Sequence, residues 1–459
     1  MTPISATYSS APSDVVSGAA FDSSADELWA LLDRKSHSTR RSRRPIIAVL
    51  GLGYVGLPTA VAMAGGAYDV LGIDVSRHRL DAIEAGRVDL LPEDSVRLGE
   101  VLRRSSLELH DQPARLHRAD AVVICVPTPV DPHLVPDLSF VESACRTAVE
   151  HARAGQTIIL TSTTCVGTTR RLLVEPLVAR GLTPGRDIFV AFSPERIDPG
   201  NGDRPQGSVP RVLGGATPMC SMRALAIIGQ VAPTVHPVSS LEAAEFTKLY
   251  ENTFRAVNIA FANEMAEMSR VLDLDVMEVI EAASTKPYGF MPFYPGSGVG
   301  GHCIPCDPHY LLWQMRAQRH QSRLVEEAMS GIAARPGRVV QRAMEVLAAD
   351  GRAIAGASVL VVGVSYKPGV EDVRGSPAVE VIESLRAQGA AVQYHDRLVP
   401  ELRLADGSVL RSVDRPELRT NSLVIVHVLQ PGSDVGWLDS CPLVLDATYR
   451  LNVPHRAVL

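Results

Sequence analysis

The chain has 459 residues, 46% of them hydrophobic and 21% charged, which is the composition of a soluble globular protein. A formal net charge of -6 argues against a nucleic-acid partner, and no apolar run approaches the roughly 20 residues that a membrane span requires. Its length exceeds one ordinary core, and its seven scattered cysteines argue against a disulfide framework, so we expect a multidomain cytoplasmic protein with reduced thiols.

Residues 1–44 are rich in Ser, Ala, Asp and Arg, and only 25–33 has the spacing of a short amphipathic helix. We therefore expect a largely disordered leader. From Pro45 the pattern changes to a β-branched run, then glycines, then a helical period. Further apolar runs end at Asp74 and begin at Ala121, Gln156 and Asp187. Solid hydrophobic runs separated by helical patterns predict a parallel sheet covered on both faces, in a Rossmann domain at 45–235.

A central helical domain is predicted at 236–330. Residues 240–272 contain neither Pro nor Gly and show helical spacing, so we expect one long helix there. Its apolar faces favour pairing with a second copy, which predicts a homodimer or higher homo-oligomer. Shorter helices are predicted at 276–283 and 322–349, the second with a break at Pro336.

Strand–helix alternation resumes in a C-terminal domain at 331–459. Apolar runs begin at Ser358 and end at Asp396, Val428 and Arg450, and a helix is predicted at 377–388. The first turn of this domain lacks the full glycine fingerprint. The expected fold class is α/β, with two Rossmann-like doubly wound domains joined by a central helical domain that contains one long helix.

The first strand leads into a dinucleotide fingerprint. Gly51, Gly53 and Gly56 lie between a predicted strand and helix, where such glycines turn the chain and admit a pyrophosphate. Asp74 ends the next strand, where its carboxylate can accept from a ribose 2′-hydroxyl and would repel a 2′-phosphate. The sequence therefore predicts NAD rather than NADP, with a purely structural glycine turn as the alternative.

The stretch "GSGVGGHCIPCDPHY" presents a cysteine behind several glycines, which would let a substrate approach the thiol closely. Cys303 is the candidate nucleophile, and Asp307 could position a water or take a proton. A buried structural cysteine is the alternative for Cys303. Zinc would need two further ligands at matching spacing, so no metal is expected. Pro305 and Pro308 favour a turn, whereas a thioredoxin-like pair would open a helix.

Lys248 and Asn252 share one face of the long predicted helix, because they lie four residues apart. A solvated helix face is an equally good interpretation of this stripe. If the face is functional, a dinucleotide, a thiol and a lysine suggest that an alcohol is oxidised through an aldehyde to an acid. The thiolate would add to the aldehyde, and the lysine ammonium would stabilise developing negative charge.

From Ile46 to about Arg450 the chain resembles the UDP-glucose/GDP-mannose dehydrogenase family, whose NAD-dependent members oxidise the C6 alcohol of a nucleotide sugar. The resemblance rests on "GLGYVGLPTA", "VPTP", "STT", "SPER", "KLYENTFRAVNIAFANE", "GGHCIPCDP" and "SYKPGVEDVRGSP", in that order.

The resemblance also implies roles for individual residues. Cys303 would be the thioester nucleophile, with Lys248 and Asn252 as oxyanion and proton-transfer partners. Asp307 and Thr163 would organise water, and Glu195 would act as a base or position water. NAD would be held by Gly51, Gly53, Tyr54, Val55, Gly56, Asp74, Arg79, Thr128, Thr163 and Arg374. The UDP-sugar would contact Glu195, Arg196, Lys248, Asn252, Tyr294, Gly298, Gly300, Tyr366, Lys367 and Arg450.

The branch that the sequence resembles most is UDP-N-acetylglucosamine 6-dehydrogenase, with UDP-N-acetylmannosamine and UDP-glucose enzymes as alternatives. Three departures from the family pattern stand out. Cys306 replaces an aliphatic residue, which leaves open a regulatory disulfide with Cys303. Cys165 and Val166 replace an aromatic residue and a proline, which puts the rigidity of their loop in doubt. The stretch "DATYRL" at Asp446 is longer than the usual form.

Two other classes of function compete with this interpretation. A two-electron enzyme, such as a β-hydroxyacid dehydrogenase or an epimerase, would share the Rossmann and long-helix architecture without needing a cysteine. A non-catalytic dinucleotide sensor would need neither the cysteine nor Lys248.

Overall fold

The computed structural model describes residues 44–459, apart from 89, 91, 197–208, 302, 419 and 454–455. The predicted leader at 1–44, with its short helix at 25–33, lies outside the described residues except for residue 44. Among the described residues, none of the helices has the length and apolar character needed to cross a membrane.

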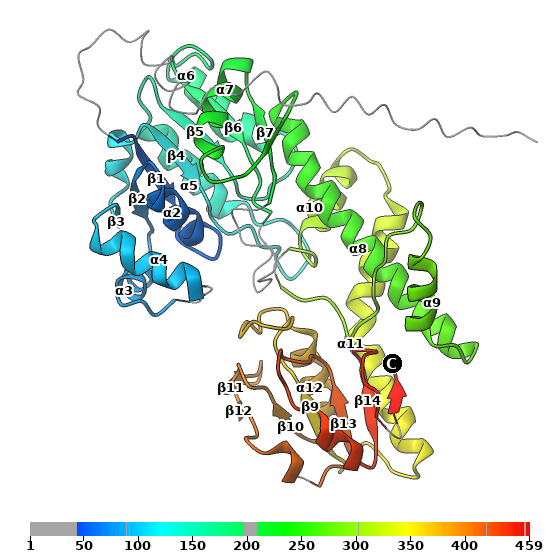
Figure 1. Cartoon of the computed structure of the whole chain (residues 1–459). Helices are drawn as coiled ribbons and strands as arrows, with labels where there is room; N and C mark the ends of the chain where they lie inside the picture. Colours follow the sequence, from blue (N-terminus) through cyan, green and yellow to red (C-terminus); the bar gives the residue numbers. More distant parts are fainter. Residues whose placement is uncertain are drawn as a thin grey trace, which may run out of the picture.

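The first lobe is built on an eight-stranded sheet in the order β3-β2-β1-β4-β5-β6-β7-β8 (Figure 1). Its strands are β1 (Ile46–Leu50), β2 (Asp69–Ile73), β3 (Leu107–His110), β4 (Ala121–Ile124), β5 (Thr157–Leu160), β6 (Phe189–Phe192), β7 (Arg211–Gly215) and β8 (Val235–Val238). All neighbours are parallel except β6 and β7. The expected parallel sheet is therefore confirmed, with one antiparallel junction that the sequence did not predict.

Helices cover both faces of this sheet. They are α2 (Gly56–Gly65), α3 (Arg77–Glu84), α4 (Pro92–Arg103), α5 (Ser139–Glu150), α6 (Glu175–Ala179) and α7 (Pro218–Ile228), with the short turns η1 (Pro113–Arg118) and η2 (Arg170–Val174). Successive residues of β1 point to opposite cores: Val49 packs with Leu57 of α2, whereas Leu50 packs with Val141 of α5. Burial on both faces explains why the strand is a continuous apolar run.

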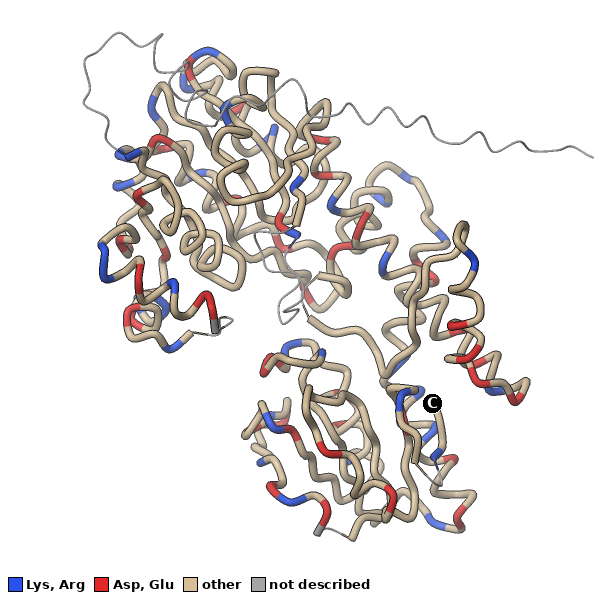
Figure 2. Tube along the Cα trace, viewed as in Figure 1, with Lys and Arg blue, Asp and Glu red and all other residues tan. Residues whose placement is uncertain are grey.

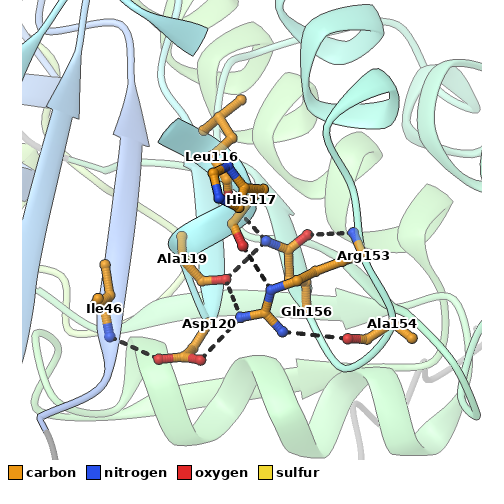
Figure 3. Close-up of polar contacts among 8 residues, drawn as sticks. All are labelled: Ile46, Leu116, His117, Ala119, Asp120, Arg153, Ala154 and Gln156. Carbon is orange, nitrogen blue, oxygen red and sulfur yellow. Dashed lines mark hydrogen bonds and ion pairs between the residues drawn. The ribbon is translucent and has the colours of Figure 1, made fainter. Parts of the chain in front are cut away.

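A polar network closes the amino-terminal edge of the sheet (Figure 3). Asp120 accepts from the Ile46 amide at 2.9 Å and pairs with Arg153 at 3.2 Å. Arg153 and Gln156 both donate to the Ala119 carbonyl, at 2.9 and 2.8 Å. These bonds satisfy backbone groups at the starts of β1 and β4, at the edge opposite the turn that begins α2, so we assign the network a structural role.

The helical middle contains α8 (Leu241–Val271), α9 (Val276–Ser284), α10 (Asp307–Ala317) and α11 (Arg323–Ala349). The Ser240 side chain caps α8 by accepting from the Ala243 amide at 3.1 Å. The long helix was predicted almost to its ends. In contrast, the predicted break at Pro336 is wrong, because α11 continues through that residue. Its apolar side is buried between α8 and the C-terminal lobe, and this packing compensates for the hydrogen bond that proline removes (Figure 1).

The C-terminal lobe has a five-stranded parallel sheet in the order β10-β9-β13-β14-β15. The strands are β9 (Ser358–Val362), β10 (Ala391–His395), β13 (Leu423–Val426), β14 (Val444–Asp446) and β15 (Arg456–Val458); β11 (Glu401–Arg403) and β12 (Val409–Arg411) form a separate antiparallel pair. α12 (Pro377–Ala387) and the turns η4 (Pro416–Leu418) and η5 (Gly436–Ser440) complete it. Figure 2 shows basic and acidic residues interspersed in both lobes.

Candidate active site

The turn between β1 and α2 has the shape that a dinucleotide requires. Gly51 has φ +90°, and a Cβ there would lie 2.6 Å from the Cys125 carbonyl oxygen. At Gly56 a Cβ would lie 1.8 Å from the Gly51 oxygen. At Gly53 there is no atom within 4 Å of the Cβ position among the described residues, so the backbone is open to an approaching pyrophosphate. The turn fits NAD, with the α2 amino terminus available to the phosphates.

Asp74 and Arg79 hold the residue between the first two glycines. The Asp74 carboxylate accepts from the Leu52 amide at 2.8 Å and from the Ser76 amide at 2.9 Å. The Arg79 Nε donates to the Leu52 carbonyl at 2.9 Å. The structure therefore brings these two predicted ribose-binding residues together at the fingerprint turn.

The C-terminal lobe contacts the same turn through Arg374. Its guanidinium lies 5.1 Å from the centre of the Tyr54 ring, and Val55 follows Tyr54 as the residue before α2. Asp372 pairs with Arg374 at 2.6 Å. The carbonyl of Arg374 accepts from the Gly301 amide at 3.3 Å, so one short segment touches both the cofactor turn and the glycine loop at 296–301.

The glycine loop packs against the C-terminal lobe. At Gly298 a Cβ would lie 2.8 Å from Pro377, and at Gly300 it would lie 2.6 Å from the Gly375 oxygen. The Tyr366 ring lies against Gly301, where a Cβ would be 3.0 Å from the nearest ring atom. Close packing between lobes thus explains the glycines at 298–301, whereas the sequence attributed them to substrate access at the thiol.

Cys303 is exposed and lies in the turn that leads into α10, while Cys306 is partly buried and is the residue before that helix. Both are thiols. The predicted turn is therefore confirmed for the two cysteines and Pro305, whereas Pro308 lies in the first turn of α10, where a missing N–H is harmless. Burial raises the pKa of the Cys306 thiol to about 11. Among the described residues, no group of three or more His, Cys, Asp or Glu is arranged to hold a metal ion.

Lys248, Asn252 and Asp307 form the polar centre beside this turn. The Asn252 amide donates to the Asp307 carboxylate. The Lys248 side chain is only 9% exposed, and its ammonium donates to the Glu195 carbonyl at 3.0 Å. Burial raises the pKa of the Asp307 carboxyl to about 6, although nearby Lys248 and the Asn252 hydrogen bond oppose the rise. The solvated-face interpretation is therefore wrong for these helix residues.

Glu195 is held in place by partners that the sequence did not predict. Its carboxylate forms a buried ion pair with Arg211 of β7, and it also accepts from the Arg196 amide at 2.9 Å. The Arg196 guanidinium pairs with Glu251 of α8. The signal for Arg211 was weak, because a charged residue at the start of a short strand is usually solvated.

Thr163 lies in a loop that is fixed from both sides. Glu245 of α8 is buried and accepts from the Gly167 and Thr169 amides at 2.6 and 2.8 Å. Gln314 of α10 exchanges two hydrogen bonds with the Val166 backbone, at 3.0 and 2.8 Å. This loop is therefore anchored without the proline that the family pattern would supply.

The remaining predicted site residues occupy several different places in the structure. Thr128 hydrogen-bonds to the phenol of Tyr310, at the base of α10. The Lys367 ammonium lies 5.8 Å from the Tyr366 ring centre. Tyr294 is exposed ahead of the glycine loop, and Arg450 is exposed beyond β14, two strands from β9 in the sheet order.

The sequence matches one protein family along most of its length. The chain matches three models of the UDP-glucose/GDP-mannose dehydrogenase family in order: the NAD binding domain at 46–231, the central domain at 242–331 and the UDP binding domain at 360–439.

Individual relatives match over most of their length. A UDP-N-acetyl-D-mannosamine dehydrogenase of Pyrococcus horikoshii is 35% identical over 388 residues, which cover 82% of this chain and 90% of the relative. An NDP-N-acetyl-D-galactosaminuronic acid dehydrogenase of Ralstonia nicotianae is 33% identical, over 77% of this chain and 84% of the relative. The solved structure of the UDP-D-ManNAc dehydrogenase from Pyrococcus horikoshii matches with a TM-score of 0.82 at 31% identity, covering 90% of this chain and 98% of that one.

Proposed function

The chain belongs to the UDP-glucose/GDP-mannose dehydrogenase family and is an NAD-dependent oxidoreductase of UDP-sugars; we propose that it oxidises the C6 alcohol of a UDP-2-acetamido sugar to the uronic acid. The observation that carries the proposal is the exposed thiol of Cys303, in the turn that leads to the buried Asp307–Asn252 pair. Lys248 lies one turn earlier on α8 than Asn252. A thiol, a cation and a carboxyl beside a dinucleotide turn are the groups that a four-electron oxidation requires.

The chemistry that NAD supplies is the acceptance of one hydride from the alcohol and a second from the thiohemiacetal. Between these transfers the Cys303 sulfur bonds to the aldehyde carbon, and the aldehyde oxygen takes up a proton. After the second transfer a water attacks the thioester, which releases the acid and restores the thiol. The Lys248 ammonium stabilises negative charge on the reacting oxygen, and ionised Asp307 accepts a proton from the attacking water.

The other predicted positions enter as supporting parts of the same proposal. Glu195 and Thr163 border the reacting centre, and Glu195 acts by positioning water, because Arg211 pairs with its carboxylate. Tyr366, Lys367 and Arg450 bind the UDP portion, since cationic side chains match a diphosphate. The division into 45–235, 236–330 and 331–459 is part of this proposal.

For the sugar, the names of two relatives support a 2-acetamido group, and one of them specifies UDP-N-acetyl-D-mannosamine. We therefore place UDP-N-acetylmannosamine ahead of UDP-N-acetylglucosamine, which the sequence resemblance favoured.

The test incubates purified protein with NAD and UDP-ManNAc, UDP-GlcNAc, UDP-glucose or GDP-mannose in turn. NADH is counted by absorbance and the product is identified by mass spectrometry. Two NADH per uronic acid formed are expected with an acetamido sugar. One NADH per sugar would replace the proposal with a two-electron dehydrogenase, and none with every sugar would reject it.

A second test separates the two oxidation steps. Cys303→Ser should abolish acid formation while UDP-sugar binding persists, because only the second oxidation needs the thiol. Cys306→Ser is the matched control, three residues away, and should retain acid formation. Full activity in Cys303→Ser would remove the thioester from the mechanism.

The assembly follows from the apolar surface of α8. Large side chains that are exposed in the single chain recur along this helix, namely Phe246, Tyr250, Phe254, Phe261 and Met268. A row of this kind is typical of an interface, and it supports a two-fold homodimer in which α8 contacts its copy.

A further inference from the structure

Arg335 of α11 is among the largest fully buried side chains of the described residues, with 1% exposure, and it has no role in the chemistry proposed above. A buried guanidinium is costly to desolvate and persists only where its donors are satisfied. Here each of the three guanidinium nitrogens donates to a different part of the chain. Nε donates to the Gly296 carbonyl at 2.8 Å, Nη1 to Glu267 of α8 at 2.9 Å, and Nη2 to the Tyr449 hydroxyl at 3.0 Å.

The first of these contacts is at the start of the glycine loop. Both backbone polar groups of Gly296 are hydrogen-bonded. Its amide donates to Asn263 of α8 at 3.0 Å, and its carbonyl accepts from Arg335. The stem of Arg335 also lies near Gly298, whose Cβ position is 3.9 Å from the Arg335 Cβ. The loop that leads to Cys303 is therefore anchored to two helices at its first residue.

The third contact reaches the C-terminal lobe. Tyr449 accepts from Arg335 and donates its own hydroxyl proton to the Leu459 carbonyl at 2.7 Å. Its backbone has φ +61°, which is unusual for a residue other than glycine. The neighbouring Asp446 holds that turn by accepting from the Thr448 and Leu451 amides, at 2.8 and 2.9 Å. The tyrosine is thus fixed within its own lobe, and its hydrogen bond to Arg335 fixes the guanidinium relative to that lobe.

We propose that Arg335 is a positioning residue for UDP-sugar oxidation, which sets the glycine loop relative to α8 and the C-terminal lobe and so determines sugar affinity and turnover without touching the sugar. The inference rests on the function proposed above, because the glycine loop matters only if it borders the sugar and carries the nucleophile. The proposed role also explains why arginine occupies this position. The planar guanidinium donates hydrogen bonds in three fixed directions, whereas lysine could supply the charge but not those directions.

The experiment compares wild type with Arg335→Lys, Tyr449→Phe and Arg342→Met. Arg342 is the matched control, because it lies two turns further along α11 and bonds to the Val458 carbonyl at 3.0 Å and to Glu345, away from the loop. Tyr449→Phe removes one hydroxyl and leaves the Arg335–Glu267 ion pair intact, so it carries the test if Arg335→Lys does not fold.

Three readouts are measured on each folded variant: KM for the sugar and for NAD, UDP affinity by calorimetry, and the rate at which iodoacetamide alkylates Cys303, followed by peptide mass spectrometry. Arg335→Lys should raise the sugar KM and the UDP Kd by about 10-fold and change the alkylation rate, since bonds to a charged group are lost. Tyr449→Phe should act in the same direction by about 2- to 5-fold. KM for NAD should stay within about 2-fold in both variants, and Arg342→Met should match wild type in all three readouts.

The proposal is overturned if Arg335→Lys and Tyr449→Phe retain wild-type sugar KM, UDP affinity and alkylation rate. It is also overturned if both KM values are unchanged and activity falls only with the folded fraction, as a purely structural role predicts. If wild type oxidises none of the sugars, the proposed function fails separately, and the UDP affinity and alkylation rates still decide whether Arg335 positions the loop.

Discussion

Replacing Asn252 with leucine should move the pH dependence of turnover, because this amide donates to the buried carboxylate of Asp307. The pKa of Asp307 is raised to about 6 by burial, and the Asn252 hydrogen bond opposes that rise. A hydrogen bond to a charged group contributes roughly 1.5–3 kcal/mol, and one pKa unit corresponds to about 1.4 kcal/mol. Asn252→Leu should therefore shift the acid limb of the rate profile upward by about 1 to 2 pH units.

The assay is kcat/KM for the UDP-sugar between pH 5 and 9 at saturating NAD. Ionised Asp307 accepts a proton in the proposed mechanism, so activity should increase as the pH rises through its pKa. Asn258→Leu is the control, because Asn258 lies on a different face of α8 and bonds to the Phe254 carbonyl of its own helix at 2.7 Å. An acid limb that stays in place in Asn252→Leu would refute the assignment of this limb to Asp307.

The same burial affects stability with a definite sign. Because the folded-state pKa of Asp307 lies above its ordinary value of 3.8, the folded protein holds this proton more tightly than the unfolded chain. The resulting stabilisation is present at low pH and is lost as pH rises from about 4 through about 6. Asp307→Asn should thus abolish acid formation yet raise the free energy of unfolding at pH 8 by up to about 3 kcal/mol, measured in urea. Equal stability at pH 8 would contradict the buried-charge argument.

Three further changes test other parts of the structure. Arg211→Met leaves Glu195 buried without its cation and should lower the free energy of unfolding in urea by about 3–5 kcal/mol; a loss below about 1 would contradict this. Gly56→Ala should abolish NAD binding, measured by calorimetry, because a Cβ would overlap the Gly51 oxygen, whereas Gly65→Ala meets nothing within 4 Å and should retain binding. Tyr250→Asp, at a side chain 62% exposed in the single chain, should convert the proposed dimer to monomer in light scattering; a persistent dimer would place the interface elsewhere.

The sequence predicted β1, β2, β4, β5 and β6 of the first sheet and β9, β10, β13 and β14 of the second, but it missed β3, β7, β8 and β15. Central strands such as β4 and β5 are fully buried, so they are continuous apolar runs. β3 and β8 are only partly buried, and β8 contains a proline, so neither has a clear hydrophobic signal. β7 is buried, but it begins with a charged residue and ends with two glycines. Complete burial therefore explains most of the predicted strands, although β10 was also predicted and is a partly exposed edge strand.

The residues of the candidate site were likewise predicted only in part from the sequence. Helical spacing placed Lys248 and Asn252 on one face, and in the structure Lys248 donates to the Glu195 carbonyl and Asn252 to the Asp307 carboxylate. Glu245, Arg211 and Arg335 were missed, because each is a charged residue within a helix or strand pattern and such residues are usually solvated. Their partners lie far away in the sequence, so no local period identifies them.

The length of α8 has a consequence for how this chain can vary. One continuous helix carries Lys248 and Asn252 near one end and Asn263 and Glu267 near the other. Inserting a single residue between the two groups would rotate one relative to the other by about 100° and translate it by about 1.5 Å. Chimeras and natural insertions should therefore be tolerated on either side of this segment and rejected within it.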